Sequence, residues 1–343
     1  MESSSVVIAL TSRLTPDQVA RIQAVDLRVT TRGIAELLSA ERRWRRAPEQ
    51  EDAFPAERRR ELADVLSQAE VIFGMDVPRD VLSRAPKLRW VQLTSAGADL
   101  AVAAGVLQSG ISVTDASGIH RVPMGEHVLG AMLALQRQLP RFLSQQAQRR
   151  WGRVIPGELR GQTLGILGLG AIGSEVARLA KAFGMRVLAI RRSAAGRQEN
   201  QGDVDVLYPP GELEQVLAES DFVLVAAPLT RETRGMLGEK QLRRMKPTAH
   251  IINIARGPII DEAALLRALK EGWIAGAALD VFEREPLPPE SEFWGLPNVL
   301  ITPHIAGGSP FHDVRATELF CENLKRYLTD QPLKNLVDKN LGY

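Results

Sequence analysis

The stretch "TLGILGLGAIGSEVARLAKAFG", residues 163–184, carries the strongest indication of the fold. Its apolar start predicts a buried strand, and the helical spacing of apolar residues toward its end predicts an amphipathic helix. Between the two lie three glycines, Gly168, Gly170 and Gly173, in the pattern G-x-G-x-x-G. Such a pattern recurs by chance, so its position between a strand and a helix is what makes it informative.

In that position each glycine has a physical role. The first permits a tight turn, the second lets the backbone approach a pyrophosphate, and the third lets helix and strand pack closely. The amides of Ala171 and Ile172 would then face the phosphates at the N-terminus of a helix. The stretch therefore predicts a dinucleotide-binding turn.

The end of the next expected strand, "RVLAI", indicates which dinucleotide to expect. In chains that bind NAD this position carries Asp or Glu, which accepts hydrogen bonds from the ribose hydroxyls. Here it carries Arg191, Arg192 and Ser193, which favour the 2′-phosphate of NADP. A charge-assisted hydrogen bond is worth about 1.5–3 kcal/mol, or roughly one to two decades of preference for NADP over NAD. Asp203 and Asp205 do not supply the missing acid, because we expect them in a polar loop rather than at the strand end.

The glycine-rich turn belongs to a longer series in which strands alternate with helices. Six strands are expected, in the runs "TLGILG", "RVLAI", "DFVLVAA", "AHIINIA", "IAGAALDV" and "VLITPH". Helices are expected at 171–183, 211–219, 238–244 and 261–271. Six strands in this alternation are the number in a doubly wound nucleotide-binding domain. Ahead of the series, "VPMGEHVLGAMLALQRQLPRF" (122–142) predicts one long helix.

The first part of the chain shows the same alternation. Short apolar runs at 5–10, 69–74, 88–93 and 110–115 predict strands, and "TPDQVARIQ" opens a helix with a Thr cap followed by Pro. Strands interleaved with helices imply parallel pairing. After residue 304 the chain has only one strong helix and a polar tail, which we expect to return to the first lobe. The predicted fold class is α/β, with two lobes.

Composition excludes several classes of protein. The 343 residues are 45% hydrophobic and 24% charged, which is typical of a soluble globular protein. A formal net charge of +2 is too small to indicate nucleic acid as the main partner. The single cysteine, Cys321, excludes an internal disulfide framework and fits a reducing compartment. No signal peptide or membrane span is expected, so the location predicted is the cytoplasm, with no membrane partner.

Polar side chains follow three of the expected strands in the second lobe. "NIARGP" carries Arg256, "LDVFEREP" carries Asp280 and Glu285, and "ITPHIAGGS" carries His304. Open α/β sheets bind their ligands at the carboxyl ends of their strands. Together these residues supply a cation for a carboxylate, a proton donor and a group to orient that donor. Hydride transfer to a 2-keto acid requires those parts.

With these motifs in place, the chain resembles the D-isomer-specific 2-hydroxyacid dehydrogenases. The resemblance covers most of the chain and is most specific over 120–310. It rests on the glycine-rich turn, on "PLT" with a second Thr, on Arg256 in N-x-x-R-G, on Glu285 before Pro and on His304 after Pro. "TSAGADL" (94–100) resembles the family's substrate loop, and residues 118–135 resemble the long helix that starts the nucleotide domain and often joins the dimer.

The resemblance implies a flavodoxin-like substrate domain made of residues 1–118 and 305–343, with a Rossmann domain at 119–304 inserted into it. The chain departs from most of the family at Arg191–Ser193, where other members have Asp. There it matches the Arg-Ser pattern of the NADPH-preferring glyoxylate/hydroxypyruvate reductases.

The resemblance also implies roles for individual residues. Arg256 would hold the substrate, His304 would donate the proton, and Glu285 would pair with the other imidazole nitrogen. The substrate loop would bind the carboxylate through Ser95, Ala96 and Gly97. Besides the turn and Arg191–Ser193, the implied cofactor residues are Pro228, Thr233, Ile254, Ala255 and Asp280.

The expected activity is reduction of a small 2-keto acid, such as glyoxylate or hydroxypyruvate, by a homodimer that prefers NADPH and can also use NAD. A formate or phosphite oxidiser is the alternative within the family. A nucleotide-sensing, corepressor-like binding protein is the alternative from another class, since a fold alone never excludes it. No metal is expected, because the five histidines and one cysteine form no cluster with ligand spacing.

Overall fold

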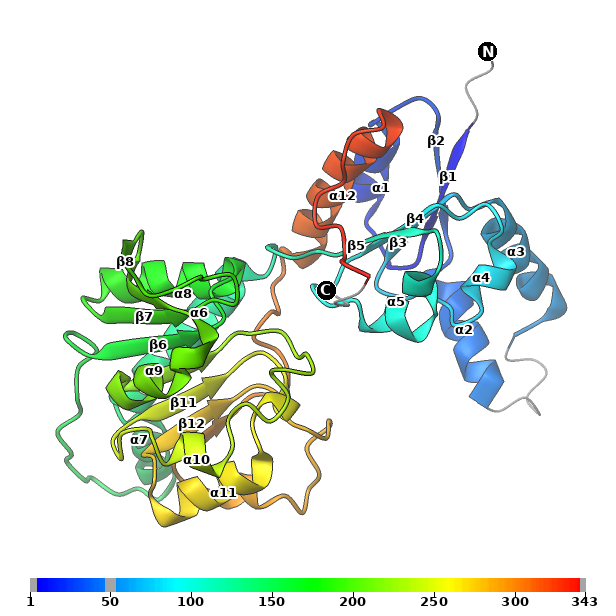
Figure 1. The fold of residues 1–343 in the computed structure, drawn as a ribbon. Helices are drawn as coiled ribbons and strands as arrows, with labels where there is room; N and C mark the ends of the chain where they lie inside the picture. The colour runs from blue at the N-terminus through cyan, green and yellow to red at the C-terminus, as the bar shows by residue number, and fades with distance from the viewer. Residues whose placement is uncertain (1–4, 47–53, 340–343) are drawn as a thin grey trace. The chain divides into compact units, whose positions relative to one another are not determined.

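The chain forms two separate units, each built on its own parallel sheet. The computed structural model describes residues 5–46 and 54–339 and divides into two compact units (Figure 1). Unit 1 contains both ends of the chain, up to Ile119 and from Pro310 onward, and unit 2 is His120–Ser309.

The sheet of unit 1 has five parallel strands in the order β2-β1-β3-β4-β5. The strands are β1 (Val6–Leu10), β2 (Val29–Gly33), β3 (Val71–Gly74), β4 (Trp90–Leu93) and β5 (Ser112–Thr114). This is the flavodoxin-like order. The four apolar runs expected to form strands do so, and β2 is an additional edge strand with the polar sequence "VTTRG".

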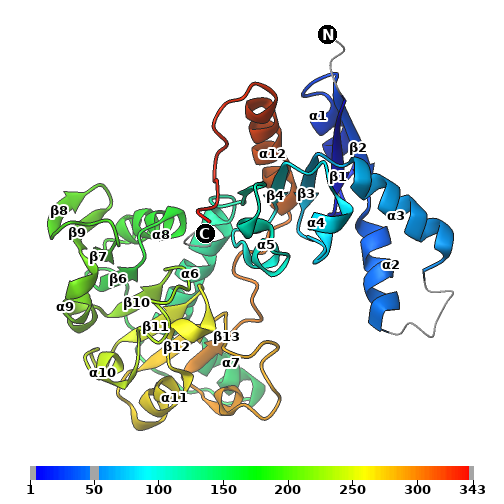
Figure 2. The ribbon, with the colours of Figure 1, turned by 45° about the vertical axis from the view of Figure 1, so that its right-hand side comes forward.

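Helices cover both faces of this sheet (Figure 2). They are α1 (Pro16–Gln23), α2 (Ala35–Arg46), α3 (Ala56–Gln68), α4 (Val81–Arg84), α5 (Asp99–Ala103), the 3₁₀ turn η2 (Val106–Gln108) and α12 (His312–Leu328). The helix start at Thr15 is confirmed, because Thr15 and Gln18 form a reciprocal capping box. On the face covered by α1 and α12, Phe320 stacks on Phe73 at 4.0 Å and on Trp90 at 5.2 Å. The tail helix α12 therefore completes the core of unit 1.

The sheet of unit 2 has eight strands in the order β13-β12-β11-β10-β6-β7-β9-β8. They are β6 (Thr163–Leu167), β7 (Arg186–Ile190), β8 (Gln198–Gln201), β9 (Val204–Tyr208), β10 (Phe222–Val225), β11 (His250–Asn253), β12 (Gly276–Leu279) and β13 (Val299–Ile301). All pairs are parallel except β8 with β9. With β6 as the first strand, the central order is 3-2-1-4-5-6, the order of a Rossmann domain.

The six expected strands are all present, as β6, β7, β10, β11, β12 and β13, but the expectation of a polar loop between the second and third was wrong, because that segment forms β8 and β9. Asp205 is in β9, where its carboxylate accepts hydrogen bonds from Lys181 Nζ at 2.8 Å and from the Val187 N–H at 2.7 Å. The alternation of Val204, Asp205 and Val206 is that of a strand with one polar side. Asp205 is therefore part of β9, where its carboxylate accepts the N–H of Val187 in β7, and it is not in a loop.

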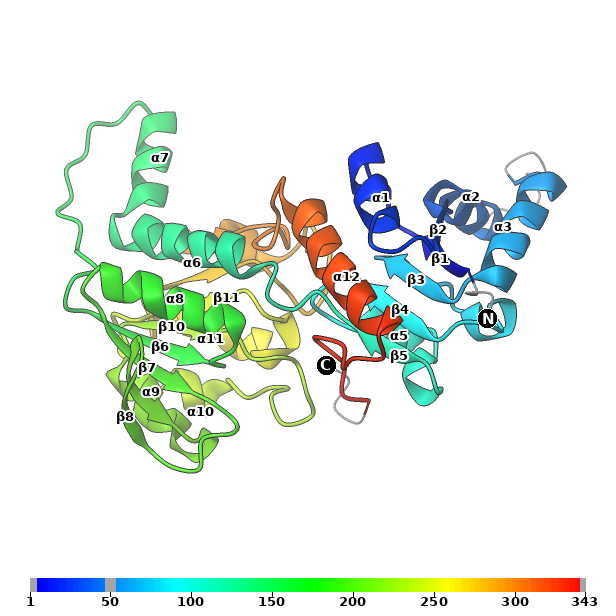
Figure 3. The same ribbon diagram turned by 90° about the horizontal axis from the view of Figure 1, so that it is seen from above.

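Helices lie on both faces of the second sheet as well. They are α6 (Arg121–Gln136), α7 (Leu139–Ala147), α8 (Ala171–Ala182), η3 (Pro210–Glu212), α9 (Leu213–Glu219), α10 (Glu239–Leu242), η4 (Gly257–Ile259), α11 (Glu262–Glu271) and η5 (Glu292–Gly295). Figure 3 shows α6 beside α8, and both pack on one face of the sheet while α9, α10 and α11 pack on the other.

The single long helix expected at 122–142 is two helices, α6 and α7. The chain turns at Gln138, whose φ is 60°, just ahead of Pro140 in the first turn of α7. Proline cannot donate a helical hydrogen bond and its ring clashes with the preceding turn, so it can start α7 but cannot continue α6.

Candidate active site

The glycine-rich turn is packed as the G-x-G-x-x-G pattern predicts. Gly168 has φ 106°, and a Cβ on it would lie 2.6 Å from the amide nitrogen of Ala227. A Cβ on Gly173 would lie 2.4 Å from the carbonyl oxygen of Gly168, so strand and helix are as close as glycine allows. At Gly170, in contrast, a Cβ would have no neighbour within 4 Å. The helix α8 begins directly after Gly170, and its first amides have no acceptor within the helix.

The Arg191–Ser193 turn lies directly beside the glycine-rich turn. The N–H groups of Gly168 and Leu169 both donate to the carbonyl oxygen of Ile190, the last residue of β7, at 3.1 Å. The chain then turns, with the Ala194 N–H donating to the Arg191 carbonyl oxygen at 3.0 Å. The side chains of Arg191, Arg192 and Ser193 are exposed at this edge.

The loop after β10 brings Pro228 and Thr233 to the same edge of the sheet. Its threonines close it: the Thr230 N–H donates to Thr233 Oγ1 at 2.7 Å, and Thr233 Oγ1 donates to the Pro228 carbonyl oxygen at 2.7 Å. Ala227, at the start of this loop, is the residue that Gly168 approaches. The expected cofactor residues thus come from adjacent loops at the carboxyl ends of β6, β7 and β10.

Arg256 follows β11 in a turn held by Asn253. The buried Asn253 side chain accepts the Ala255 N–H at 3.1 Å and donates to the Arg256 carbonyl oxygen at 3.1 Å. Arg256 Nη1 donates to the Ala255 carbonyl oxygen at 2.8 Å, and Ile254 is buried in the core. Gly257, the next residue, packs on the loop after β12, since a Cβ there would lie 2.0 Å from the carbonyl carbon of Phe282. The loops that carry Arg256 and Glu285 are therefore in direct contact.

His304 and Glu285 form a hydrogen-bonded dyad. His304 Nδ1 lies 2.7 Å from Glu285 Oε2, and the other carboxylate oxygen, Oε1, accepts the Phe282 N–H at 3.0 Å. The His304 side chain is half exposed. Because Nδ1 faces Glu285, the Nε2 nitrogen is the one left to exchange a proton with a ligand.

Asp280 fixes the backbone around His304. It is buried, and its carboxylate accepts hydrogen bonds from Thr302 Oγ1 at 2.6 Å and from the N–H groups of Ile305 and Ala306 at 2.9 Å. Its carbonyl oxygen accepts the His304 N–H at 2.8 Å. With these contacts His304 is held at a φ of 53°, a conformation rare for a residue with a side chain. His127 on α6 reaches the same loop, with Nε2 3.4 Å from Thr302 Oγ1.

Sequence reasoning did not single out Asn253, Gly257 or Thr302. Asn253 and Gly257 appear in the family pattern around Arg256, but their tasks depend on contacts with other loops. Asn253 could have been singled out as Asp280 was, because each is a polar residue at the end of a buried strand.

In unit 1, Ser95, Ala96 and Gly97 follow β4 at the carboxyl edge of that sheet. Ser95 Oγ donates to the Gly97 carbonyl oxygen at 2.8 Å, which curls the loop. Among the described residues, the N–H groups of these three residues donate to no other group. Three consecutive unpaired amides can bind an anion.

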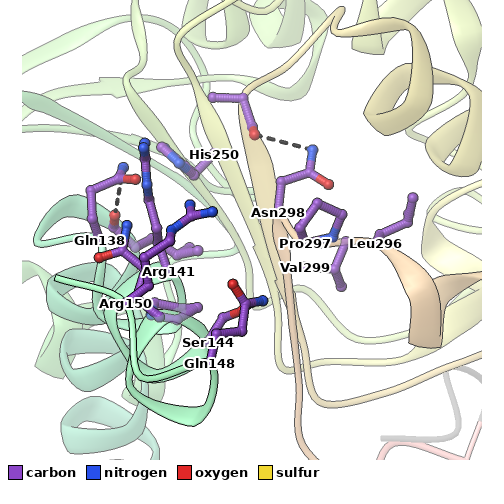
Figure 4. Close-up of a pocket in the computed structure, with 14 residues that line it drawn as sticks. Gln138, Arg141, Ser144, Gln148, Arg150, His250, Leu296, Pro297, Asn298 and Val299 are labelled. Atoms are coloured by element: carbon purple, nitrogen blue, oxygen red, sulfur yellow. Dashed lines mark hydrogen bonds between the residues drawn. The ribbon is translucent and has the colours of Figure 1, made fainter. Parts of the chain in front are cut away.

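A separate cavity of about 660 Å³ lies at the opposite edge of the unit 2 sheet (Figure 4). Its walls include Arg141 and Ser144 from α7, together with His250 and Asn298 at the amino-terminal ends of β11 and β13. None of the expected site residues lines it. Strands present their ligand-binding loops at the other end, so this cavity is not the catalytic site.

Two absences hold for the part of the chain that the structure describes. It contains no group of three or more His, Cys, Asp or Glu side chains placed to hold a metal ion. None of its helices is both long enough and apolar enough to cross a membrane.

Comparison with known proteins identifies the family. Residues 129–306 match the model of the D-isomer specific 2-hydroxyacid dehydrogenase NAD binding domain. The chain belongs to this family. It is therefore one of the nicotinamide-dependent 2-hydroxyacid dehydrogenases, with its nucleotide-binding domain in unit 2.

Individual members of the family align over most of the chain. The glyoxylate reductase of Korarchaeum cryptofilum is 38% identical over 271 residues, 77% of this chain and 80% of the relative. The glyoxylate reductase of Pyrococcus furiosus is 37% identical over 303 residues, 85% of this chain and 88% of the relative.

Two solved structures of 2-hydroxyacid dehydrogenases show the same fold. A D-isomer specific 2-hydroxyacid dehydrogenase from Xanthobacter autotrophicus, in complex with NADPH and MES, is 29% identical with a TM-score of 0.79, covering 99% of this chain and 100% of its own. An NADPH-dependent glyoxylate/hydroxypyruvate reductase from Sinorhizobium meliloti, in complex with NADP and sulfate, is 28% identical with a TM-score of 0.75 and the same coverage. The two-lobed fold expected from the sequence, a Rossmann domain inserted into a flavodoxin-like domain, is confirmed.

Proposed function

We propose that this dehydrogenase reduces a small 2-keto acid of the glyoxylate or hydroxypyruvate type to the D-2-hydroxy acid, with NADPH preferred over NADH. The His304–Glu285 contact of 2.7 Å is the observation that carries the proposal. The relatives named glyoxylate reductase and the structural neighbour named as an NADPH-dependent glyoxylate/hydroxypyruvate reductase support the choice of substrate.

His304 acts as the general acid. Glu285 accepts a hydrogen bond from Nδ1 and orients the ring, and Nε2 is the nitrogen that passes a proton to the carbonyl oxygen of the substrate. The loop contacts of Asp280 hold the imidazole in place during this transfer. The nicotinamide, when bound in its reduced form, supplies the hydride.

Arg256 binds the substrate through its carboxylate and its carbonyl oxygen. A guanidinium is always charged and can donate two parallel hydrogen bonds, so it both attracts the acid and polarises the carbonyl. We assign the amides of Ser95, Ala96 and Gly97, in unit 1, to the binding of a carboxylate.

The cofactor is held by loops of unit 2. The glycine-rich turn with Ala171 and Ile172 binds the pyrophosphate, and Arg191, Arg192 and Ser193 bind the 2′-phosphate that distinguishes NADP from NAD. Pro228, Thr233, Ile254 and Ala255 line the rest of the site, and Asp280 has an acceptor position left for the nicotinamide amide.

The active form is a homodimer, and the enzyme works in the cytoplasm. Large apolar side chains stand exposed on α7 and the segment after it: Leu143 is 65% exposed, Trp151 91% and Ile155 97%. Such a patch on a protein in water indicates a binding surface, and a second copy is the occupant we propose. Light scattering on the wild type and on Ile155→Asp tests this; a wild type that is monomeric at micromolar concentration contradicts it.

Rates of NADPH oxidation with a panel of 2-keto acids test the proposed activity. We expect turnover with glyoxylate and hydroxypyruvate and much less with bulky keto acids. NADPH binding without turnover on any keto acid would indicate a sensor, and reduction of NADP by formate or phosphite would indicate the other branch of the family.

A further inference from the structure

Glu262, in the first turn of α11, contacts the loop that carries Glu285. Its Oε1 accepts a hydrogen bond from the N–H of Glu283. Glu285 Oε1 accepts the neighbouring N–H, that of Phe282. Two carboxylates therefore hold two consecutive amides of the same turn, and one of the two is the partner of His304.

The same turn is packed from its other side by Gly257. A Cβ on Gly257 would lie 2.3 Å from the amide nitrogen of Glu283, so this peptide has no room to move toward Arg256. Glu262 also borders a small internal void with Asn253, Gly257 and Phe282. Glu262 therefore contacts the Glu285 turn directly and borders the same void as Asn253 and Gly257.

The charges around Glu262 are mostly of its own sign. Glu283 and Glu285 face it from the loop after β12, and Asp261 precedes it as the N-cap of α11. Burial raises the pKa of the Glu262 carboxyl, Glu283 and Glu285 raise it further, and the N–H of Glu283 opposes the rise. Glu262 therefore places a second carboxylate close enough to interact with Glu285, the partner of His304.

We propose that Glu262 is a positioning residue for the His304–Glu285 dyad, acting through its hydrogen bond to the Glu283 amide and through its negative charge. The inference rests on the proposed function, in which that dyad is the proton donor. The hydrogen bond fixes where the Glu285 carboxylate stands. The charge acts on Glu285, with which Glu262 interacts. The groups in contact with His304 or its loop are Glu285, which pairs with Nδ1, Asp280, which accepts the N–H groups of Ile305 and Ala306, and His127, which lies across Thr302.

Three substitutions separate the two contributions. Glu262→Gln keeps an acceptor for the amide and removes the charge. Glu262→Asp keeps the charge and shortens the reach, and Glu262→Ala removes both. Glu239→Gln is the matched control, since Glu239 also opens a helix of unit 2, α10, but pairs with Arg243 and Arg267 on the surface.

Two measurements are made on each variant. The first is the pH profile of kcat/KM for keto-acid reduction with NADPH. The second is the NMR titration of the His304 imidazole in the protein without ligand, with the signal assigned by comparison with His304→Gln. For Glu262→Gln we expect both midpoints to move to lower pH by about half a unit, with the KM for NADPH unchanged. For Glu262→Asp we expect the same midpoints as in the wild type. We expect kcat to fall about tenfold, because the shorter side chain displaces the Glu283 amide and with it the Glu285 carboxylate that orients His304.

The NMR titration needs no turnover, so it tests the inference about Glu262 separately from the proposed function. If Glu262→Gln leaves both midpoints where they are in the wild type, the inference is overturned and Glu262 only braces the fold. If His304→Gln reduces keto acids at the wild-type rate, the proposed function is wrong, whatever the imidazole titration shows. A shift of equal size in Glu239→Gln would also overturn the inference, and a Glu262→Ala variant that does not fold leaves the Gln and Asp variants to decide.

Discussion

His304 Nδ1 lies 2.7 Å from Glu285 Oε2, although the two residues follow different strands of the sheet. The strands concerned, β12 and β13, are neighbours, and Asp280 at the end of β12 holds the His304 loop through both its side chain and its backbone. The dyad therefore depends on the carboxyl end of β12, because this end is followed by Glu285 and its Asp280 anchors the loop that carries His304.

Replacing Glu285 with Gln should lower kcat/KM for keto-acid reduction by about ten- to a hundredfold at neutral pH. The amide cannot stabilise an imidazolium as a carboxylate does, so the loss should grow as the pH rises. His304→Gln should cost about two decades or more at every pH. A Glu285→Gln profile parallel to that of the wild type would mean that Glu285 only supports the loop.

Replacing Arg192 with Ala should weaken the use of NADPH and leave that of NADH nearly unchanged. The lost charge-assisted hydrogen bond corresponds to about one to two decades in kcat/KM for NADPH. Arg178→Ala, which removes an exposed arginine paired with Glu175 on α8, is the control and should change neither value. Equal losses with both cofactors would make Arg192 a structural residue.

Gly257→Ala should reduce both stability and turnover. The added methyl group would meet the backbone of Phe282 and Glu283 at 2.0–2.3 Å, so the Glu285 turn must move. Overpacking of this kind costs about 1–3 kcal/mol in the free energy of unfolding, measured with urea. Gly211→Ala is the control, because nothing lies within 4 Å of a Cβ there. A Gly257→Ala variant as active as Gly211→Ala would show that the two loops are not mechanically linked.

His250 should make the protein less stable in mild acid. Burial lowers the pKa of its imidazole from 6.5 to about 4, and the ring stacks on Phe222 at 5.2 Å. Between pH 6.5 and about 4, His250 binds a proton in the unfolded chain but not in the folded chain. The free energy of unfolding therefore falls as the pH falls from about 6.5 to about 4. The contribution is at most about 3 kcal/mol.

His250→Phe keeps an aromatic ring stacked on Phe222 and removes the imidazole that binds the proton. Urea unfolding of the wild type and His250→Phe at about pH 7 and about pH 4.5 should show a smaller loss for the variant. The measurement at about pH 7 is the control, because the ring is neutral there in both states. Identical losses in the two proteins would mean that other groups cause the acid sensitivity.

The parts of the site that could be predicted from sequence are those with local signals. The turn at 168–173 needs only a strand, a helix and glycines at fixed spacing, and His304 follows its strand within a few residues. The parts that could not be predicted depend on partners distant in sequence. Gly257 is important because it packs against Phe282. Asp280 was expected as a cofactor residue, but its role in holding the His304 loop depends on the amides of Ile305 and Ala306.

The strands that were not predicted also depend on contacts with other parts of the chain. β2 and β8 are edge strands with the polar sequences "VTTRG" and "QENQ", and each takes its conformation from a single neighbouring strand. β9 carries Asp205, which becomes compatible with a sheet only through Lys181 and the Val187 N–H. Hydrophobic pattern alone does not predict strands that are stabilised by such pairing.

The proposed activity and cofactor preference are tested together by comparing kcat/KM for NADPH and for NADH in the reduction of glyoxylate by the wild-type enzyme. We predict turnover with both cofactors and a preference for NADPH of about tenfold or more, because Arg191 and Arg192 stand where an acid would select NAD. Equal or better use of NADH, or no oxidation of NADPH with glyoxylate or hydroxypyruvate, would contradict the proposed function.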